Sequence, residues 1–330
     1  MRHNKHKAAC RVFRWSICAA LMVALLSACS HQAGNQATIA AEKAKPVHRT
    51  DQFVATAATP DRVAAGTIKG VLVGSTDDGK SWTRTELPQP ASIVGMAACP
   101  DGTLAALGFY RKLWVADGNK WQPRPIATKM NPVAITCDAS NKLWVVGSRT
   151  TVASSADHGK TWQTQKLGKD AILSSVQFLD PQHGIAVGEL GTVAITSDGG
   201  ANWTLSEPLP QHFYPYTVYF ADLQHGWVSG VAGALYVTTD GGQNWQEVHN
   251  PVKAPIFALA GSGDSVYGVG ADGKVIAWRG GQWTELQPKG LSSSELTAIT
   301  LLPSGGELAV GGNELHKLNL SNNGAQGGLS

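Results

Sequence analysis

Residues Gly191–Trp203 read GTVAITSDGGANW, and this stretch contains the unit from which most of the chain is built. The core of the unit is a Ser or Thr, an Asp, a Gly and a Trp at fixed spacing, and we call each copy an Asp box. Four copies occur, at Ser75, Asp77, Gly79 and Trp82, at Ser155, Asp157, Gly159 and Trp162, at Thr196, Asp198, Gly200 and Trp203, and at Thr238, Asp240, Gly242 and Trp245. Shortened versions end at Trp121 and Trp283, so the six tryptophans recur every 38 to 42 residues. A period near 40 residues in a Gly-rich chain with many short strand patterns predicts a β-propeller or a solenoid.

The residue types of the box suit a turn between two strands. Val193-Ala194-Ile195 precedes the third box as a strand-like run, and the Asp and Gly that follow are typical of a hairpin turn. An Asp carboxylate accepts N–H bonds inside its own turn, and a Ser or Thr hydroxyl ties the start of the loop. The Trp then buries an indole as the chain returns. We therefore interpret the boxes as structural; a catalytic or calcium-binding Asp is the alternative, and the spacing of an EF-hand loop is absent.

A second periodic marker counts the repeats. A glycine closes the second strand pattern of each repeat at seven positions spaced by 39 to 42 residues: Gly66, Gly108, Gly147, Gly188, Gly230, Gly270 and Gly311. Seven glycines predict an all-β, seven-bladed propeller over residues 44–320, made of four-stranded antiparallel blades. The last repeat has patterns for only three strands, so we expect a strand within residues 38–49 to complete it and close the ring.

The N-terminus has the features of an export signal. Residues 1–28 carry five bases, no acid and the apolar run Trp15–Leu26, which is too short to span a bilayer. They end in Leu26-Ser27-Ala28-Cys29, which resembles the lipobox of bacterial lipoproteins, so Cys29 is the expected lipidation site. Ser30, which is not Asp, then suggests the outer membrane facing the periplasm. An ordinary cleaved signal is the alternative. Residues 29–43 are expected to form a flexible tether, and residues 321–330 a disordered tail.

Charge and cysteine usage narrow the possible partners and cofactors. Loss of the five signal bases leaves 22 basic and 24 acidic residues, which together with export argues against nucleic acid as a partner. Cys99 and Cys137 lie at matching places in adjacent repeats, and both a disulfide and two buried thiols are compatible with the sequence. Histidines and cysteines show no ligand spacing, so neither a metal nor another cofactor is expected.

Two longer stretches carry a family resemblance. His183–Gly191 reads HGIAVGELG before the third box, and His225–Trp245 reads HGWVSGVAGALYVTTDGGQNW. Over roughly residues 50–320 the chain resembles the photosystem II assembly and stability factor family of Asp-box propellers. The resemblance implies a seven-bladed, non-enzymatic propeller that helps to assemble a membrane protein complex through a basic patch on one face. Nothing in the sequence indicates a photosynthetic host.

Loops on the side opposite the Asp boxes carry the expected partner-binding residues. Bases and a tyrosine follow the marker glycines of the first three repeats, at Lys69, Tyr110, Arg111, Lys112 and Arg149. An aromatic loop between the fourth and fifth repeats adds Phe213, Tyr214 and Tyr216. Aromatic and Arg side chains are enriched at binding hot spots, which predicts a protein partner, from an envelope or membrane complex, on this face. The alternative is a solvated rim of charges with aromatics that plug the central channel.

A glycoside hydrolase is the rival function, because sialidases and some glucanases combine propellers with Asp boxes. Such enzymes need two positioned carboxylates, or a Tyr nucleophile with an arginine triad. The Arg-Ile-Pro motif of sialidases is missing, and the loop carboxylates Glu189, Asp170, Asp272 and Glu295 share no motif. No catalytic residue is therefore assigned.

Overall fold

A computed structural model describes residues 36, 38–118, 120–262, 265–289, 291, 294–312 and 314–319. The predicted signal sequence, Cys29 and the predicted tail at residues 321–330 lie outside the described residues. The chain divides into two units, Met1–His48 and Arg49–Ser330, and each is considered by itself.

The described part of the first unit is helical. Residues 38–43 form a helix and residues 44–47 form turns and bends. The expected closing strand within residues 38–49 is therefore wrong. The reason is local, because Ala40, Ala41, Glu42 and Lys43 are strong helix formers. Among the described residues, no helix is long and apolar enough to cross a membrane.

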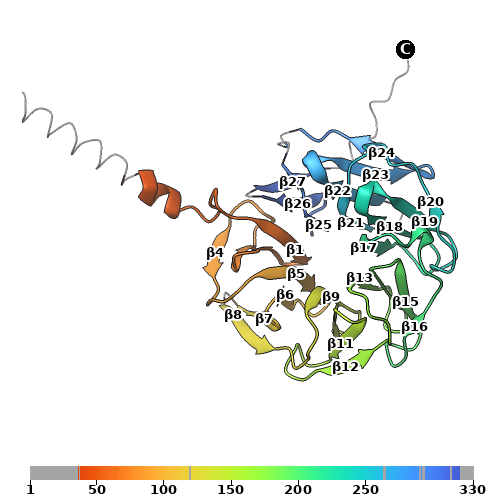
Figure 1. Ribbon diagram of the computed structural model, residues 1–330. Helices are drawn as coiled ribbons and strands as arrows, with labels where there is room; N and C mark the ends of the chain where they lie inside the picture. The colour runs from red at the N-terminus through yellow and green to blue at the C-terminus, as the bar shows by residue number, and fades with distance from the viewer. Residues whose placement is uncertain are drawn as a thin grey trace, which may run out of the picture. The chain divides into compact units, whose positions relative to one another are not determined.

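The second unit is a seven-bladed β-propeller whose sheets are arranged in a ring (Figure 1). Each blade is one antiparallel sheet of consecutive strands, and blades are numbered along the chain. Blades 1 to 3 comprise β1 (Phe53–Thr59), β2 (Arg62–Thr67), β3 (Val71–Ser75) and β4 (Thr83–Glu86); β5 (Ile93–Ala98), β6 (Leu104–Gly108), β7 (Lys112–Asp117) and β8 (Lys120–Pro125); and β9 (Pro132–Cys137), β10 (Leu143–Gly147), β11 (Thr151–Ser155) and β12 (Gln163–Lys166).

Blades 4 to 7 continue the same order. They comprise β13 (Leu173–Phe178), β14 (Gly184–Gly188), β15 (Thr192–Thr196) and β16 (Thr204–Leu205); β17 (Pro215–Phe220), β18 (Gly226–Gly230), β19 (Leu235–Thr238) and β20 (Gln246–Glu247); β21 (Ile256–Ser262), β22 (Ser265–Gly270), β23 (Val275–Arg279) and β24 (Gln282–Leu286); and β25 (Ala298–Leu301), β26 (Glu307–Gly311) and β27 (Glu314–Leu318). Short 3-10 turns at η1 (Pro210–His212), η2 (Val231–Gly233) and η3 (Ala271–Gly273) lie in the connecting loops.

The marker glycines confirm the count of seven blades. Six of them end the second strand of their blade, and Gly66 is the last but one residue of β2. A Cβ atom at Gly188 would lie 2.7 Å from the Cα atom of Leu173, and one at Gly270 would lie 2.8 Å from the Cα atom of Ile256. Glycine recurs here because the second strand passes this close to the start of the innermost strand.

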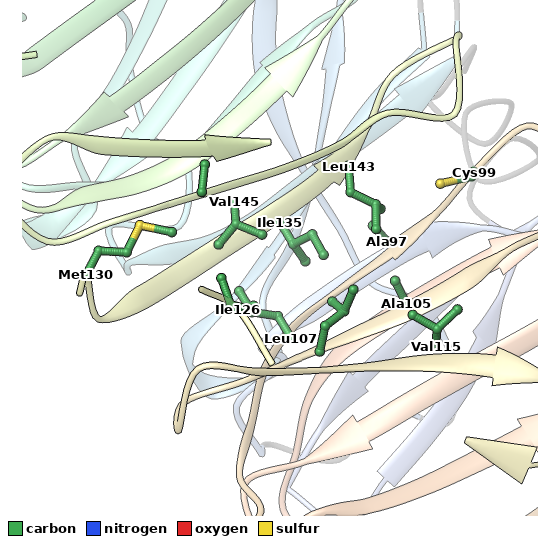
Figure 2. Close-up of a cluster of buried hydrophobic side chains, with 12 residues drawn as sticks. Ala97, Cys99, Ala105, Leu107, Val115, Ile126, Met130, Ile135, Leu143 and Val145 are labelled. Atoms are coloured by element: carbon green, nitrogen blue, oxygen red, sulfur yellow. The ribbon is translucent and has the colours of Figure 1, made fainter. Parts of the chain in front are cut away.

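The core lies between blades, as expected for sheets that cannot bury both faces alone. The cluster drawn in Figure 2 joins blades 2 and 3 and includes Leu107, Leu113, Ile135, Leu143 and Val145. The middle strands are buried on both faces, as in β10 with the sequence LWVVG, whereas the outermost β12, with the sequence QTQK, is mostly exposed.

A disulfide joins Cys99 to Cys137, which decides between the two states that the sequence allows. Cys99 directly follows β5 and Cys137 ends β9, so the bond links the innermost strands of blades 2 and 3. Their Cα atoms lie 5.2 Å apart, within the usual range for a disulfide.

Blade 7 has three strands in the described residues, and the ring closes through contacts between blades 7 and 1. The N–H of Phe53 at the start of β1 donates to the carbonyl of Gly312 at 2.7 Å. The Thr297 hydroxyl donates to the carbonyl of Phe53 at 2.9 Å. On the other face, the Asp78 carboxylate of the first Asp box accepts from the Lys317 ammonium group and the Ser304 hydroxyl.

A second box makes the same kind of contact to its preceding blade. His158, in the box of blade 3, lies 2.8 Å from the Asp101 carboxylate of blade 2, and its carbonyl accepts from the Arg124 guanidinium group of β8. The box thus both closes a hairpin and fastens one blade to the one before it.

Candidate functional site

The four Asp boxes lie in the turns between the third and fourth strands of blades 1, 3, 4 and 5. In each, the Ser or Thr hydroxyl donates to the Asp carboxylate at 2.7 to 2.9 Å and accepts the N–H of the box glycine at 2.7 to 3.0 Å. The carboxylate also accepts two hydrogen bonds from the residue four positions after the Asp, one from its backbone N–H and one from its side chain. These residues are Ser81, Thr161, Asn202 and Asn244.

These bonds lower the pKa of all four box carboxyl groups. The hydroxyls of Ser81 and Thr161 have the largest effect on the pKa of Asp77 and Asp157. The backbone N–H groups of Asn202 and Asn244 have the largest effect on the pKa of Asp198 and Asp240. A carboxylate held ionised by its own turn is poorly suited to act as a general acid, which would need a raised pKa.

The lowered pKa values predict acid sensitivity of the fold. Because the folded-state pKa of each box Asp is depressed, its contribution to stability is present above the unfolded value, near 3.8, and is lost as the pH falls through the folded value. We expect the midpoint temperature of thermal unfolding to decrease as the pH is lowered from about 4 to about 2. Asp157→Asn should lower the midpoint at pH 6 and flatten this dependence. A midpoint that stays constant across this window in the wild-type protein would contradict the structural role of the boxes.

Two of the box tryptophans bond to the glycine of their own turn. Trp162 and Trp245 donate their indole N–H groups to the carbonyls of Gly159 and Gly242 at 3.1 Å. Trp203 is half-buried, and its indole nitrogen is buried without a hydrogen-bond partner among the described residues. The hydrogen bonds of the boxes thus stay largely within their own turns, and the first box also lines a pocket of about 410 Å³ together with Pro303 and Ser304 of blade 7.

The histidines of the repeated Asp-x-x-His turns are held by their neighbours. His183 Nδ1 lies 2.8 Å from Asp180 Oδ2, and His225 Nδ1 lies 2.9 Å from Asp222 Oδ2. The backbone N–H of His225 contributes most to lowering the pKa of Asp222 to about 2. These contacts give the histidines a turn-forming role.

The opposite ends of the strands form a second surface, which we call the loop face. It consists of the loops between the second and third strands of each blade and the connections between blades. The residue that follows the second strand donates its backbone N–H to the residue that precedes the innermost strand of the same blade. Examples are Ile68 N–H to Gln52 O at 3.0 Å and Phe109 N–H to Ser92 O at 2.8 Å. The two kinds of loop therefore lie at the same end of the blade.

The predicted bases of blades 1 to 3 all lie on the loop face. Lys69, Arg111 and Arg149 are exposed, whereas Lys112 begins β7 and is half-buried, with its ammonium group 5.3 Å from the centre of the Trp114 ring. Arg111 donates to the Thr128 carbonyl at 3.4 Å, and Lys69 donates to the Thr50 carbonyl at 3.3 Å. Among the described residues, none of the four forms an ion pair.

An apolar pocket of about 440 Å³ lies on the loop face, and its lining includes Ile68 and Ser148, the sequence neighbours of Lys69 and Arg149. Its wall comes from blades 1 to 4, and sequence reasoning did not identify it as a site. Its apolar side chains include Val54, Ile68, Val94, Phe109, Val133 and Ile172. One sequence feature indicates the pocket weakly: Ile68 is an apolar residue in a short loop, directly before Lys69.

The aromatic loop before β17 does not join this pocket. Phe213 turns inward and stacks on Tyr236, with ring centroids 4.9 Å apart. Tyr214 is half-buried, and burial is the main cause of its raised pKa. Tyr216 lies on β17 and contacts Phe257 of blade 6 at a centroid distance of 5.4 Å. Tyr110 is 53% exposed and packs against Phe109 with ring centroids 5.4 Å apart. With Arg111 and Lys129 it lines a separate pocket.

The loop carboxylates do not form a metal site. Glu189 Oε2 accepts the N–H of Ile172 at 2.8 Å, which gives that carboxylate a structural contact. Within the ranges that the structure describes, no group of three His, Cys, Asp or Glu side chains is arranged to hold a metal ion.

Comparisons with known proteins place these features in context. Residues 162–255 match the family model described as photosynthesis system II assembly factor YCF48. The chain is 30% identical over 172 residues to the photosystem II assembly lipoprotein Ycf48 of Picosynechococcus sp., a match that covers 48% of this chain and 51% of that protein. The chain thus spans about half the length of the curated relatives it matches.

Solved structures share the fold. YCF48 bound to a D1 peptide matches with a TM-score of 0.65 and 15% identity, over 81% of this chain and 90% of that one. Virginiamycin B lyase from Staphylococcus aureus matches with a TM-score of 0.72 and 16% identity, over 83% of this chain and 96% of that one. At these identities the likeness shows the propeller alone, and neither the peptide nor the lyase chemistry follows from it.

Proposed function

From its similarity to Ycf48 assembly proteins, we propose that this chain is a non-enzymatic, periplasm-facing lipoprotein that binds a protein during assembly of an envelope or membrane complex. The observation that carries the proposal is the loop face of blades 1 to 3, which carries the exposed bases Lys69, Arg111 and Arg149 and an apolar pocket. The relatives in the comparison are assembly proteins, and one bears the name lipoprotein.

Two features support a binding role over hydrolysis. The box carboxylates are saturated by hydrogen bonds from their own turns, and Glu189, one of the loop carboxylates, is engaged by a backbone N–H. Among the described residues, Lys69, Arg111 and Arg149 form no ion pair, and such exposed bases favour an acidic protein surface. Exposed charges of this kind mainly raise the rate of association.

Charge reversal tests the face. The double variant Arg111→Glu and Arg149→Glu should reduce capture of partners from detergent-solubilised envelopes, mainly by slowing association, and raised salt should reduce wild-type capture in the same way. Lys80→Glu with Lys160→Glu is the matched control, because it makes the same change of charge on exposed residues of the Asp-box turns. Equal capture by the two double variants, with unchanged salt dependence, would exclude the loop face as the binding surface.

The anchor has a separate test. Cys29 ends the lipobox-like sequence at the close of the signal, so Cys29→Ala should shift the protein from the membrane fraction to the soluble fraction, or leave the signal uncleaved. Cys18→Ala, inside the apolar run of the signal, is the control that should stay with the membrane. Fractionation and processing that do not change in Cys29→Ala would refute lipidation. A disulfide between Cys99 and Cys137 agrees with an oxidising compartment such as the periplasm.

A further inference from the structure

Blade 2 differs from blades 1, 3, 4 and 5 in the turn between its third and fourth strands. β7 ends at Asp117 and β8 begins at Lys120, so a short turn replaces the long turn of an Asp box. The tryptophan of the shortened box, Trp121, lies on β8. Blade 2 therefore lacks a full box on the Asp-box face, which is the end of the blades opposite the loop face.

A full box fills the edge of the seam between its own blade and the preceding one. The blade 4 box packs so closely on blade 3 that a Cβ atom at Gly200 would lie 2.0 Å from the Trp144 ring. From the outermost strand of blade 3, the Gln165 side chain donates to the carbonyls of Gly200 at 2.9 Å and Ala201 at 3.1 Å. The box thus satisfies the side chain that faces it across the seam.

The seam between blades 1 and 2 has no such box, and a recess of about 140 Å³ lies there. Thr85 holds in β4 the position that Gln165 holds in β12, three residues after the box tryptophan. It lines the recess and is half-buried, and among the described residues its hydroxyl group has no hydrogen-bond partner. The recess is therefore the space that a box of blade 2 would fill.

Hydroxyl groups and one tryptophan give the recess its chemical character. Blade 1 lines it with five hydroxyl-bearing side chains: Ser75, Thr76, Ser81, Thr83 and Thr85. Blade 2 contributes the half-buried Trp121 above an apolar base that includes Leu104 and Ala116. Both β4 and β8 are outermost strands, so the recess lies at the rim of the ring (Figure 1).

The charges next to the recess are engaged by protein groups. Arg62 is the one charged side chain in its lining among the described residues; it donates to the Gly118 carbonyl at 2.7 Å, and its Nε atom lies 3.9 Å from the Asp61 carboxylate. The adjoining pocket of about 410 Å³ shares Arg62 with the recess and is lined by acids and bases together. Its half-buried acid, Asp78, pairs with Lys317. This balance favours an uncharged polar ligand, because an ionic ligand needs a complementary excess of charge.

We propose that the recess between blades 1 and 2 binds a neutral saccharide. A sugar ring carries hydroxyl groups at its edge and C–H groups on its faces. Threonine hydroxyls both donate and accept, so Thr83 and Thr85 can exchange hydrogen bonds with the edge while a face packs on the Trp121 indole. The adjoining pocket, whose volume lies within the range of about 300 to 1,000 Å³ that is typical of ligand pockets, gives room for further sugar units. The site lies on the face opposite the proposed protein-binding surface, so it adds a second binding activity to the proposed function.

Saturation-transfer NMR with three neutral trisaccharides tests the proposal with defined probes: maltotriose, mannotriose and triacetylchitotriose. The protein, without its lipid anchor and free of detergent, should transfer saturation to at least one of them. Thr83→Val with Thr85→Val should bind that trisaccharide at least about tenfold more weakly, because each change removes a hydroxyl group and keeps the shape of the side chain. If none of the three trisaccharides receives saturation from the wild-type protein, the proposal is overturned.

Blade 4 supplies the matched control. Thr204 and Ser206 hold the same two positions after the box tryptophan, but the next blade has a full box that fills this seam. Thr204→Val with Ser206→Ala therefore removes two hydroxyl groups away from the recess and should leave the affinity within about twofold. Equal losses of affinity in the two double variants would overturn the assignment to the recess. Thermal unfolding of each variant separates loss of binding from loss of folding.

A filled recess gives an independent test. Thr85→Gln supplies the side chain that blade 3 has at Gln165, and its extra bulk should abolish saccharide binding without lowering the midpoint temperature of unfolding. Saccharide binding that survives Thr85→Gln would overturn the assignment, and so would loss of envelope-protein capture in this variant without any trisaccharide signal. The charge reversal at Arg111 and Arg149 should leave saccharide binding unchanged, so failure of this proposal and failure of the proposed function can be told apart.

Discussion

Replacing Trp144 by alanine is expected to lower the free energy of unfolding by about 3 to 5 kcal/mol, the usual cost of removing a buried aromatic side chain. Trp144 lies in β10 and is 1% exposed. Its ring stacks on Phe178 of blade 4 at a centroid distance of 4.4 Å, so it fastens blade 3 to blade 4. The substitution would leave a cavity between two blades, and each blade can bury its faces only against its neighbours.

Polar contacts add to the expected loss. The indole N–H of Trp144 donates to Asp138 Oδ2 at 2.9 Å, and Asp138 is buried. The Lys142 ammonium group lies 4.1 Å from the centre of the Trp144 ring, a cation–π arrangement. Without the indole, the Asp138 carboxylate loses one of its buried donors.

Denaturant unfolding of Trp144→Ala and Trp203→Ala makes the comparison. Trp203 belongs to an Asp box but is only half-buried, and its indole nitrogen has no hydrogen-bond partner among the described residues. We expect the loss for Trp203→Ala to be the smaller of the two. A loss below about 1 kcal/mol for Trp144→Ala would mean that this contact between blades does not limit stability.

Removing the disulfide is expected to cost about 2 to 4 kcal/mol. Cys99 and Cys137 are 38 residues apart, and closing a loop of this size restricts the unfolded chain considerably. The double variant Cys99→Ala and Cys137→Ala should unfold at lower denaturant concentration than the oxidised wild type. The bond spans the junction of blades 2 and 3, so its loss should also favour local opening there.

Reduction supplies the internal control for the disulfide. Dithiothreitol should destabilise the wild-type protein and have no effect on the double variant. If the oxidised wild type and the double variant unfold at the same denaturant concentration, the bond contributes nothing to the native state.

The repeat, the number of blades and the turn chemistry follow from the sequence. The Asp of each box forms its hydrogen bonds with residues only a few positions away, so its role in the turn can be predicted from the adjacent sequence. This holds for Asp77, Asp157, Asp198 and Asp240. The marker glycines are equally local, because each stands where a second strand meets the innermost strand of its own blade. The three strands of the last repeat were also predicted correctly.

The candidate site was predictable only in part. The exposed bases Lys69, Arg111 and Arg149 stand out in the sequence because charged residues in short loops point to solvent. Phe213 was grouped with Tyr214 and Tyr216, but it stacks on Tyr236 of the following repeat, and the direction of a loop side chain depends on such partners. The box spacing does not mark Trp144, because this residue stands in the continuous apolar strand LWVVG and outside any Asp box.

Tertiary structure alone decided how the ring closes, whether Cys99 and Cys137 pair, and where the apolar pocket lies. Closure joins Phe53 to Gly312 and Asp78 to Lys317, residues more than two hundred positions apart. The disulfide depends on a separation between two Cα atoms in different blades, and the pocket is lined by residues of four successive blades. Ring closure, the disulfide and the pocket all depend on distances between repeats. The sequence pattern of one repeat predicts only the contacts within its own strands and turns.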